Sequence, residues 1–235
     1  ADYIKAMFEH HRGLFDYGAL LQGGELNSVE LTPDGIVYRF RTADVRMRLT
    51  VADRRVAPIE TLNFGAYEPA EARALLALAT PGCRILDIGA NHGYFSLVLA
   101  RLVAGCELDS FEPIPANHAA LVANLALNGQ RNVRAHHLAL SDREGTATFY
   151  FNPTYVTASS QHDLTREPGV ETVECPMRTL DGWLAESGGK SVGLIKCDVE
   201  GAELAVFRGA RQTLAAQRPA LFTELLRKWS ERFGY

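Results

Sequence analysis

The 235-residue chain has few cysteines, no long apolar run and no run of basic residues. The four cysteines are far apart and form no C-x-x-C pair: Cys83, Cys106, Cys175 and Cys197. This spacing indicates neither a disulfide framework nor a zinc site, and it suits the reducing cytoplasm. The longest apolar candidate, 95–104, is interrupted by Arg101 and is shorter than the roughly 20 residues of a membrane span. A formal net charge of −4 argues against binding to nucleic-acid phosphates.

Two common glycine-loop motifs are also missing. Counted from Gly89, the dinucleotide fingerprint G-x-G-x-x-G requires glycine at positions 91 and 94, where the chain has Asn91 and Tyr94. A phosphate-binding P-loop requires Gly-Lys followed by Ser or Thr, and this sequence occurs nowhere. The missing glycines therefore argue against the alternative of an oxidoreductase that uses NAD, which detection of hydride transfer would establish.

The chain does contain a strand, a glycine turn and the start of a helix at 85–96. Such a unit is the first half of a βαβ fold, in which ligands bind at the carboxyl ends of the strands. The turn reads Asp87-x-Gly89-x-Asn91-x-Gly93 and resembles the first motif of class I S-adenosylmethionine (SAM) methyltransferases, with asparagine in place of the middle glycine. Because SAM has an ammonium group and no pyrophosphate, a carboxylate such as Asp87 suits its amino-acid end. Ala90 belongs to the same predicted cofactor loop.

A second carboxylate is expected at the end of the next strand. The segment 107–112 reads as a strand that ends in Glu112 and is followed by Pro113. Glu112 lies 23 residues after Gly89, close to the offset of about 20 at which an acidic residue binds ribose hydroxyls in nucleotide-binding βαβ units. Glu112 is therefore predicted to bind the ribose of the cofactor, although a solvated strand-end carboxylate is the simpler alternative.

Four ordered segments resemble the FkbM family of SAM-dependent methyltransferases. They are Asp87-Ile-Gly-Ala-Asn-His-Gly93, Phe111-Glu-Pro113, Ala139-Leu-Ser-Asp142 and Leu194-Ile-Lys-Cys-Asp-Val-Glu-Gly-Ala-Glu203. Upstream, Gly65-Ala-Tyr-Glu-Pro69 is similar to a segment that often precedes the first motif, and the resemblance covers roughly 60–225. Cys197 departs from the family, which usually has an aliphatic residue at this position.

The resemblance implies SAM as cofactor and S-adenosylhomocysteine as product. It also implies that Leu140 and Ser141 lie at the adenine edge, where a turn into a hairpin is the alternative. Glu68 would contribute to the methionine end of the cofactor or to the floor of the substrate site or, equally, begin a helix with Pro69.

The predicted fold is α/β: a Rossmann-like, doubly wound, mostly parallel sheet of the class I methyltransferase type. Strands are expected at 84–88, 107–112, 133–140, 192–198 and from 220, and the helices between them at about 93–104, 115–127 and 200–216. Residues 1–60 predict a separate extension with a helix and short antiparallel strands, ahead of a SAM-binding domain at 61–235. Only ten residues follow Leu225, so the last strands of a class I methyltransferase are expected to be missing.

Three charged residues near the end of the fourth predicted strand are the catalytic candidates. Lys196, Asp198 and Glu200 alternate, so in a strand they would share one face. A carboxylate there can stabilise a sulfonium or accept a hydroxyl proton, whereas the alternative is a cap of the following helix, which we prefer for Glu203. His92 is predicted to pack within the loop, and no metal site is expected.

The sequence therefore predicts a methyltransferase that transfers a methyl group from SAM to a hydroxyl of a small molecule, and the resemblance suggests sugar or polyketide-like acceptors. Selectivity for the acceptor is expected from residues 1–60 and from the 151–175 loop. A carboxyl- or N-methyltransferase of the same fold and a SAM-binding module without catalysis remain alternatives. The oligomeric state is not readable from the sequence.

Overall fold

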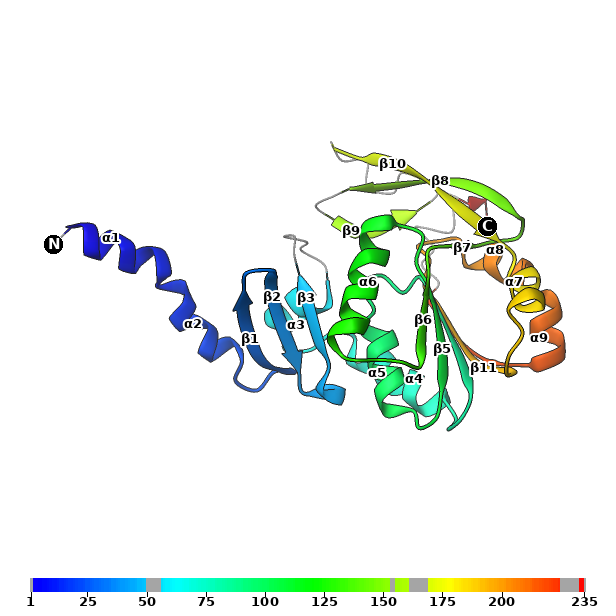
Figure 1. Cartoon of the computed structure of the whole chain (residues 1–235), viewed down its shortest axis with the longest axis horizontal. Coiled ribbons are helices and arrows are strands. Elements are labelled where there is room, and N and C mark those ends of the chain that lie inside the picture. The colour runs from blue at the N-terminus through cyan, green and yellow to red at the C-terminus, as the bar shows by residue number, and fades with distance from the viewer. Residues whose placement is uncertain (1, 50–55, 153–154, 161–168, 225–232, 235) are drawn as a thin grey trace.

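A central sheet of five parallel strands organises the computed structural model, which describes residues 2–49, 56–152, 155–160, 169–224 and 233–234 (Figure 1). In spatial order the strands are β12 (Ala220–Thr223), β11 (Val192–Cys197), β4 (Arg84–Ile88), β5 (Glu107–Phe111) and β6 (Val133–His136). The order reverses beside β4, because β5 and β6 lie on one side of it and β11 and β12 on the other. Ligands of doubly wound sheets bind at such a switch point, outside the carboxyl ends of the strands.

Helices cover both faces of this sheet, as the alternating pattern predicts (Figure 1). One face carries α4 (Pro69–Leu78), α5 (Tyr94–Leu102) and α6 (Pro115–Leu127); the other carries α7 (Leu180–Ser187), α8 (Glu203–Arg208) and α9 (Arg211–Gln217). Strand β4 shows why both faces need cover, since Ile85 packs into one apolar core while Leu86 and Ile88 pack into the other. The predicted α/β, doubly wound fold is confirmed.

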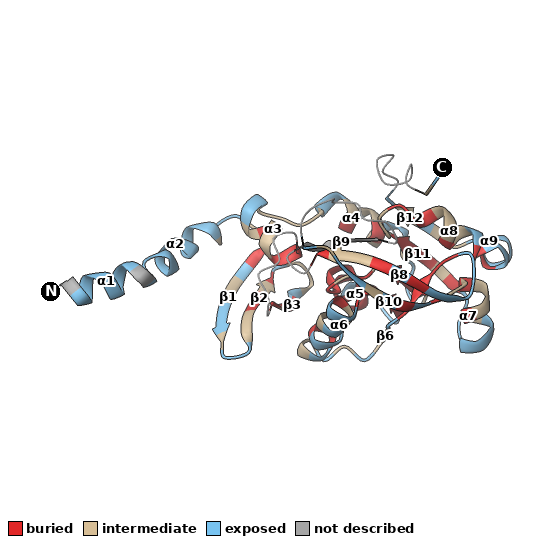
Figure 2. Cartoon of the chain, turned by 90° about the horizontal axis from the view of Figure 1, so that it is seen from above, coloured by how far each residue is buried: buried red, intermediate tan, exposed pale blue. Residues whose placement is uncertain are grey.

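The N-terminal residues form a small antiparallel sheet ahead of the central sheet. It contains β1 (Leu26–Thr32), β2 (Gly35–Phe40) and β3 (Arg46–Leu49), followed by the helix α3 (Ala57–Phe64). A short 3-10 turn, Thr42–Asp44, links β2 to β3. The first two helices, α1 (Asp2–His11) and α2 (Gly13–Leu20), project away from the rest of the molecule and expose apolar side chains such as Ile4 and Phe15 (Figure 2).

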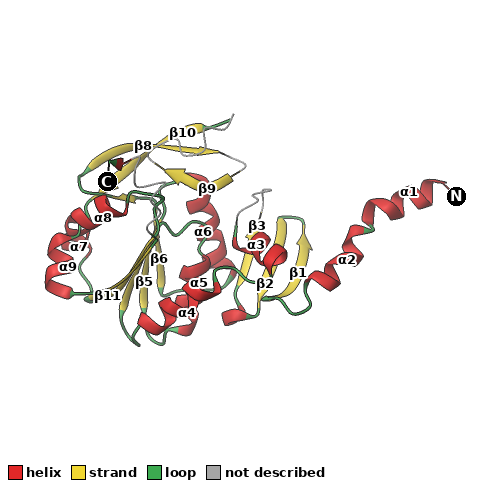
Figure 3. Ribbon diagram, turned by 180° about the vertical axis from the view of Figure 1, so that it is seen from behind, coloured by secondary structure: helices red, strands yellow, loops and turns green. Residues whose placement is uncertain are grey.

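A second sheet lies across the carboxyl edge of the central strands (Figure 3). The sequence indicates only a turn into a hairpin after Ser141, not the whole sheet. Its order is β7 (Ala139–Leu140), β10 (Glu171–Arg178), β8 (Gly145–Asn152) and β9 (Tyr155–Ser160). The single strand predicted at 133–140 is therefore wrong, because the chain leaves the central sheet after His136 and pairs in parallel with β10. Pairing with a strand so far along the chain leaves no mark in local periodicity.

The helix predicted at 200–216 is two helices, α8 and α9, which separate at Gly209 and Ala210. A Cβ on Gly209 would lie 1.9 Å from the carbonyl oxygen of Ser141, so the helix break packs directly against the turn after β7. Thr179 caps α7, since its hydroxyl accepts a hydrogen bond from the Gly182 amide at 3.1 Å.

The expectation of missing last strands concerns residues after Leu225, most of which lie outside the described residues. The loop expected at 151–175 is wrong where it is described, because β8 runs to Asn152, β9 covers Tyr155–Ser160 and β10 begins at Glu171; residues 153–154 and 161–168 lie outside the described part of the chain. Among the described residues, no helix is long and apolar enough to cross a membrane.

Candidate functional site

The loop after β4 follows a backbone path that explains its unusual sequence. Gly89 has a φ of +80°, and a Cβ there would lie 1.9 Å from the carbonyl oxygen of Asp198. Asn91 has a φ of +50° and Gly93 one of +91°. Asparagine is one of the few non-glycine residues that tolerate this left-handed region, so Asn91 can replace the middle glycine of the motif without changing the path.

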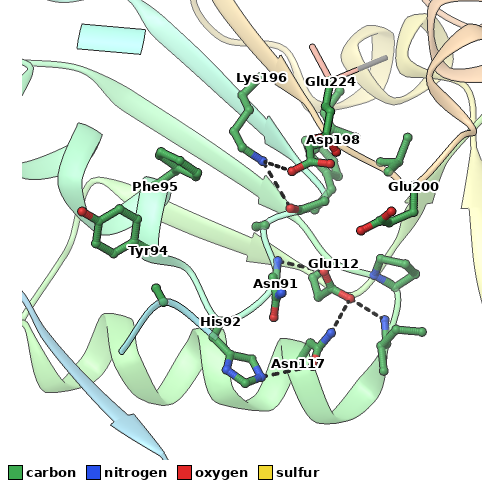
Figure 4. Close-up of a pocket in the computed structure, with 18 of the residues that line it drawn as sticks. Asn91, His92, Tyr94, Phe95, Glu112, Asn117, Lys196, Asp198, Glu200 and Glu224 are labelled. Carbon is green, nitrogen blue, oxygen red and sulfur yellow. Dashed lines mark hydrogen bonds and ion pairs between the residues drawn. The ribbon is translucent and has the colours of Figure 1, made fainter. Parts of the chain in front are cut away.

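Glu112 holds this loop against the end of the neighbouring strand. One carboxylate oxygen accepts the Asn91 amide at 2.9 Å, and the other accepts the Ile114 amide at 3.0 Å and the Asn117 side-chain amide at 3.4 Å (Figure 4). Only 5% of the residue is exposed. Burial raises the pKa of Glu112 to about 7, against the opposing effect of these hydrogen bonds. The carboxyl group therefore changes charge near neutral pH.

A buried ammonium lies on the other side of the loop. Lys196 Nζ is 3.4 Å from Asp87 Oδ1 and 3.7 Å from Asp198 Oδ2. The second Asp87 oxygen accepts the Ser96 hydroxyl at 2.6 Å. Burial opposes the charge of Lys196, but the two carboxylates outweigh it and raise its pKa. The three charged groups therefore form one electrostatic unit beneath the switch point.

The carboxylates after β11 have different positions. Strand β11 ends at Cys197, so Asp198 and Glu200 lie in the following turn, where Glu200 has a φ of +52°. The strand alternation used to group them with Lys196 therefore does not apply, although all three side chains line one cavity (Figure 4). Glu203 lies in the first turn of α8, as expected, but it does not cap the helix. Its carboxylate accepts the Val199 and Gly201 amides at 3.1 Å each and so holds the turn that precedes the helix.

A further carboxyl group, Glu68, enters the cavity from the start of α4. Its φ of +41° is strained for a non-glycine residue, and Pro69 begins the helix directly after it. Burial and, next, the charge of Asp198 raise the pKa of Glu68 to about 7. Beside it, Tyr67 packs edge-on against Tyr94, with ring centroids 5.1 Å apart, and completes an aromatic wall with Phe95.

Ten of the thirteen predicted site residues line this cavity: Glu68, Gly89, Ala90, Asn91, Glu112, Pro113, Leu140, Lys196, Asp198 and Glu200. The other three do not. Asp87 is fully buried under Lys196, Gly93 faces the Leu121 side chain, and the Ser141 amide donates to the Arg178 carbonyl at 2.8 Å as part of the second sheet. Ser141 thus continues the contact of β7 with β10, and the cavity lining ends one residue before it, at Leu140.

Several cavity residues were not predicted individually. Asn117 and Ile114 come from the start of α6, and Met47, Val56, Ala57 and Glu60 come from the N-terminal part of the chain. One sequence feature could have identified Asn117: an asparagine inside an apolar helix pattern. A buried amide requires hydrogen-bond partners, so such a residue is expected to bind other groups. Among the described residues, no cluster of three or more His, Cys, Asp or Glu side chains could hold a metal ion.

A doubly wound sheet with a glycine loop and two strand-end carboxylates at its switch point is the architecture of the class I methyltransferases. The family profile described as the Methyltransferase FkbM domain matches residues 87–234. The chain belongs to this methyltransferase family, and the family and fold imply SAM as the cofactor. The alternative of an oxidoreductase is thereby set aside.

Characterised relatives share part of the chain. The 2-O-methyltransferase NoeI of Sinorhizobium fredii is 32% identical over 162 residues, which cover 63% of this chain and 65% of NoeI. The 31-O-demethyl-FK506 methyltransferase FkbM of Streptomyces tacrolimicus is 31% identical over 156 residues, covering 55% of this chain and 60% of that protein. The chain thus spans less than two thirds of either relative. A crystal structure of methyltransferase FkbM from Methylobacillus flagellatus aligns with a TM-score of 0.43 at 16% identity, over 73% of this chain and 45% of that one.

Proposed function

We propose that this protein transfers the methyl group of SAM to a hydroxyl oxygen of a small molecule. One observation carries the proposal: the Asn91 amide joins the glycine loop to Glu112, and this junction shares a cavity with Lys196 and Asp198. A sugar or polyketide-like hydroxyl is the acceptor class we favour. Two relatives support it, since NoeI is a 2-O-methyltransferase and FkbM of Streptomyces tacrolimicus is a 31-O-demethyl-FK506 methyltransferase.

The cavity offers a complementary group for each part of the cofactor. Glu112 would accept the ribose hydroxyls, and the apolar side chains of Ile114 and Leu140, with Pro113, would flank the adenine. Gly89 has no side chain and would let the backbone pass close to the sugar, with Ala90 and Asn91 next to it in the same cavity. Glu68 would attract the ammonium of the methionine end. Asp87 and Gly93 would act from outside the cavity, Asp87 by holding Lys196 and Gly93 by turning the chain into α5.

When bound, SAM supplies a methyl group already activated by its sulfonium. The protein then has to align the acceptor oxygen with that carbon and to remove the hydroxyl proton as the C–O bond forms and the C–S bond breaks. We assign the proton to Asp198 or Glu200, whose carboxylates line the cavity beside Lys196. Lys196, at 3.7 Å, would hold the Asp198 carboxylate in place beside the acceptor.

We also propose that different parts of the chain bind the cofactor and the acceptor. Residues 61–235 would hold the cofactor, and the extension at 1–60 would supply the acceptor wall through Met47, Val56, Ala57 and Glu60. A non-catalytic SAM-binding module remains the second candidate, and methyl transfer to any acceptor would exclude it.

Calorimetric titration with S-adenosylhomocysteine tests the cofactor assignment. The wild type should bind it, and Glu112→Gln should weaken binding by about 1–3 kcal/mol, because a charge-assisted hydrogen bond is lost. Glu107→Gln is the matched control on the same strand, since its carboxylate pairs with Lys190 at 3.0 Å outside the cavity. Absence of binding to a folded wild type would overturn the proposal.

The pH dependence of that affinity gives a second test. Glu112 and Glu68, each with a pKa of about 7, are mostly protonated at pH 6 and mostly ionised at pH 8. Affinity for S-adenosylhomocysteine should therefore rise roughly tenfold over this interval for each carboxylate that must be ionised. The rise should be smaller in Glu112→Gln than in the wild type, and equal pH profiles would contradict the role of Glu112.

Stability of the ligand-free protein should change in the opposite direction. The pKa of Glu112 is raised on folding from its ordinary value of 4.5, so the folded state binds its proton more tightly than the unfolded state. The contribution of this group to stability is complete below pH 4.5 and is lost as the pH rises through about 7. Urea unfolding at pH 5 and 7.5 should show the difference in unfolding free energy between wild type and Glu112→Gln shrinking with pH.

A further inference from the structure

Two asparagines of α6 and a third at its C-terminal cap lie between the N-terminal sheet and the cofactor loop. Asn117, Asn124 and Asn128 lie near one face of the helix, at spacings of seven and four residues. Among the described residues, strand β3 pairs only with β2 and is an edge strand of its sheet. Its free side faces α6, where asparagine side chains take the place of a further strand. The backbone N–H and C=O groups on the outer side of β3 thereby have hydrogen-bond partners without a further strand.

Asn128 contacts the sheet without touching the loop. Its side-chain oxygen accepts the Arg46 amide at 2.8 Å, and its side-chain nitrogen donates to the Arg46 carbonyl at 2.6 Å. The same nitrogen also lies 2.7 Å from the Asn124 carbonyl within the helix. Asn128 therefore docks β3 on α6.

Asn124 bridges the two units with the two ends of one amide. Its oxygen accepts the Arg48 amide of β3 at 2.8 Å, and its nitrogen donates to the His92 carbonyl at 3.0 Å. The residue is completely buried, so no water replaces either bond in the folded protein. Because one end must accept and the other must donate, the amide has a single satisfied orientation.

The carbonyl held by Asn124 lies at the centre of the strained part of the loop. His92 stands between Asn91 and Gly93, which both have positive φ. Its ring is also tied to α6, since Nε2 lies 3.2 Å from the Asn117 oxygen, and Asn117 donates to Glu112 at 3.4 Å. On the sheet side, Met47 is the residue between Arg46 and Arg48, and it lines the cavity. The Asn124 amide thus connects the strand that carries Met47, part of the proposed acceptor wall, to the cofactor loop.

We infer that Asn124 is a positioning residue that couples the docking of the N-terminal sheet to the conformation of the cofactor loop. Cofactor binding would stabilise the loop and, through the shared amide, the position of Met47; docking of β3 would in turn favour the loop conformation that binds the cofactor. The coupling to binding rests on the proposed function, whereas the structural link between sheet and loop does not.

Amide exchange of the ligand-free protein tests the link itself. Asn124→Leu is nearly isosteric and loses both bonds, and Asn128→Leu is the matched control because it loses two bonds to β3 and none to the loop. Asn124→Leu should accelerate exchange in both 46–49 and 89–95, whereas Asn128→Leu should accelerate only 46–49. Equal exchange of 89–95 in the two variants would overturn the inference.

Titration with S-adenosylhomocysteine then tests the coupling. We expect Asn124→Leu to lower the affinity roughly tenfold and Asn128→Leu to leave it within about twofold, although both variants lower the melting temperature. The ligand should also slow exchange of 46–49 in the wild type but not in Asn124→Leu. Equal affinities of the two variants would refute the coupling, while a folded wild type that binds no ligand would refute the proposed function instead. If Asn124→Leu does not fold, Asn124→Ser gives the same comparison.

Discussion

Gly89→Ala should be among the most destabilising single substitutions in the loop, with a loss of more than about 3 kcal/mol in unfolding free energy. Two effects add. A φ of +80° costs an L-residue roughly 1–2 kcal/mol. The new Cβ would also overlap the Asp198 carbonyl oxygen at 1.9 Å, and that oxygen belongs to the backbone, which cannot rotate away as a side chain can. Either β4 or the turn after β11 must move, and both carry cavity residues.

Gly82→Ala separates the two effects. Gly82 has a φ of +76°, close to that of Gly89, but nothing lies within 4 Å of a Cβ built on it. Its substitution should therefore cost only the backbone term, about 1–2 kcal/mol. Urea unfolding of both variants, with S-adenosylhomocysteine titration of any folded fraction, measures the difference. Similar losses in the two variants would show that the contact with Asp198 relaxes easily.

The sequence allowed a close prediction of the central sheet, because each of its strands is short, apolar and separated from the next by a helical pattern. Strand β4 is the clearest case: every one of its residues is buried, and a glycine turn ends it. The second sheet was missed for the opposite reason. Strand β7 has only two residues, and its pairing with Met177 and Arg178 depends on a hairpin that comes later in the chain.

The candidate site could be predicted where a residue type must meet a backbone requirement. Two kinds of site residue could be predicted in this way: glycine or asparagine at positive φ, and a carboxylate at the end of a strand. Asn124 could not, because its partners Arg48 and His92 are 76 and 32 residues away along the chain. Asp87 shows the limit of such reasoning: its place in the motif was recognised, but the buried partner Lys196 is reached only through the pairing of β4 with β11.

Lys196→Met should destabilise the protein by about 3–5 kcal/mol, because it leaves the Asp87 carboxylate buried without its ammonium partner. Asp87 would keep only the Ser96 hydroxyl, at 2.6 Å. Protonation relieves a lone buried carboxylate, so the loss should be smaller at pH 5 than at pH 8. Urea unfolding at the two pH values measures this directly.

The double variant Asp87→Asn with Lys196→Met distinguishes stability from function. Replacing both members of a buried ion pair by neutral groups of similar volume is often close to neutral, so the double variant should regain most of the stability that Lys196→Met alone loses. It should nevertheless stay impaired in methyl transfer, because Asp198 loses the cation 3.7 Å from its carboxylate. Recovery of both stability and activity would show that Lys196 serves only to neutralise Asp87. A double variant as unstable as Lys196→Met alone would instead show that the stability is lost because Lys196 no longer packs against Phe95, whose ring centroid lies 5.3 Å from the ammonium.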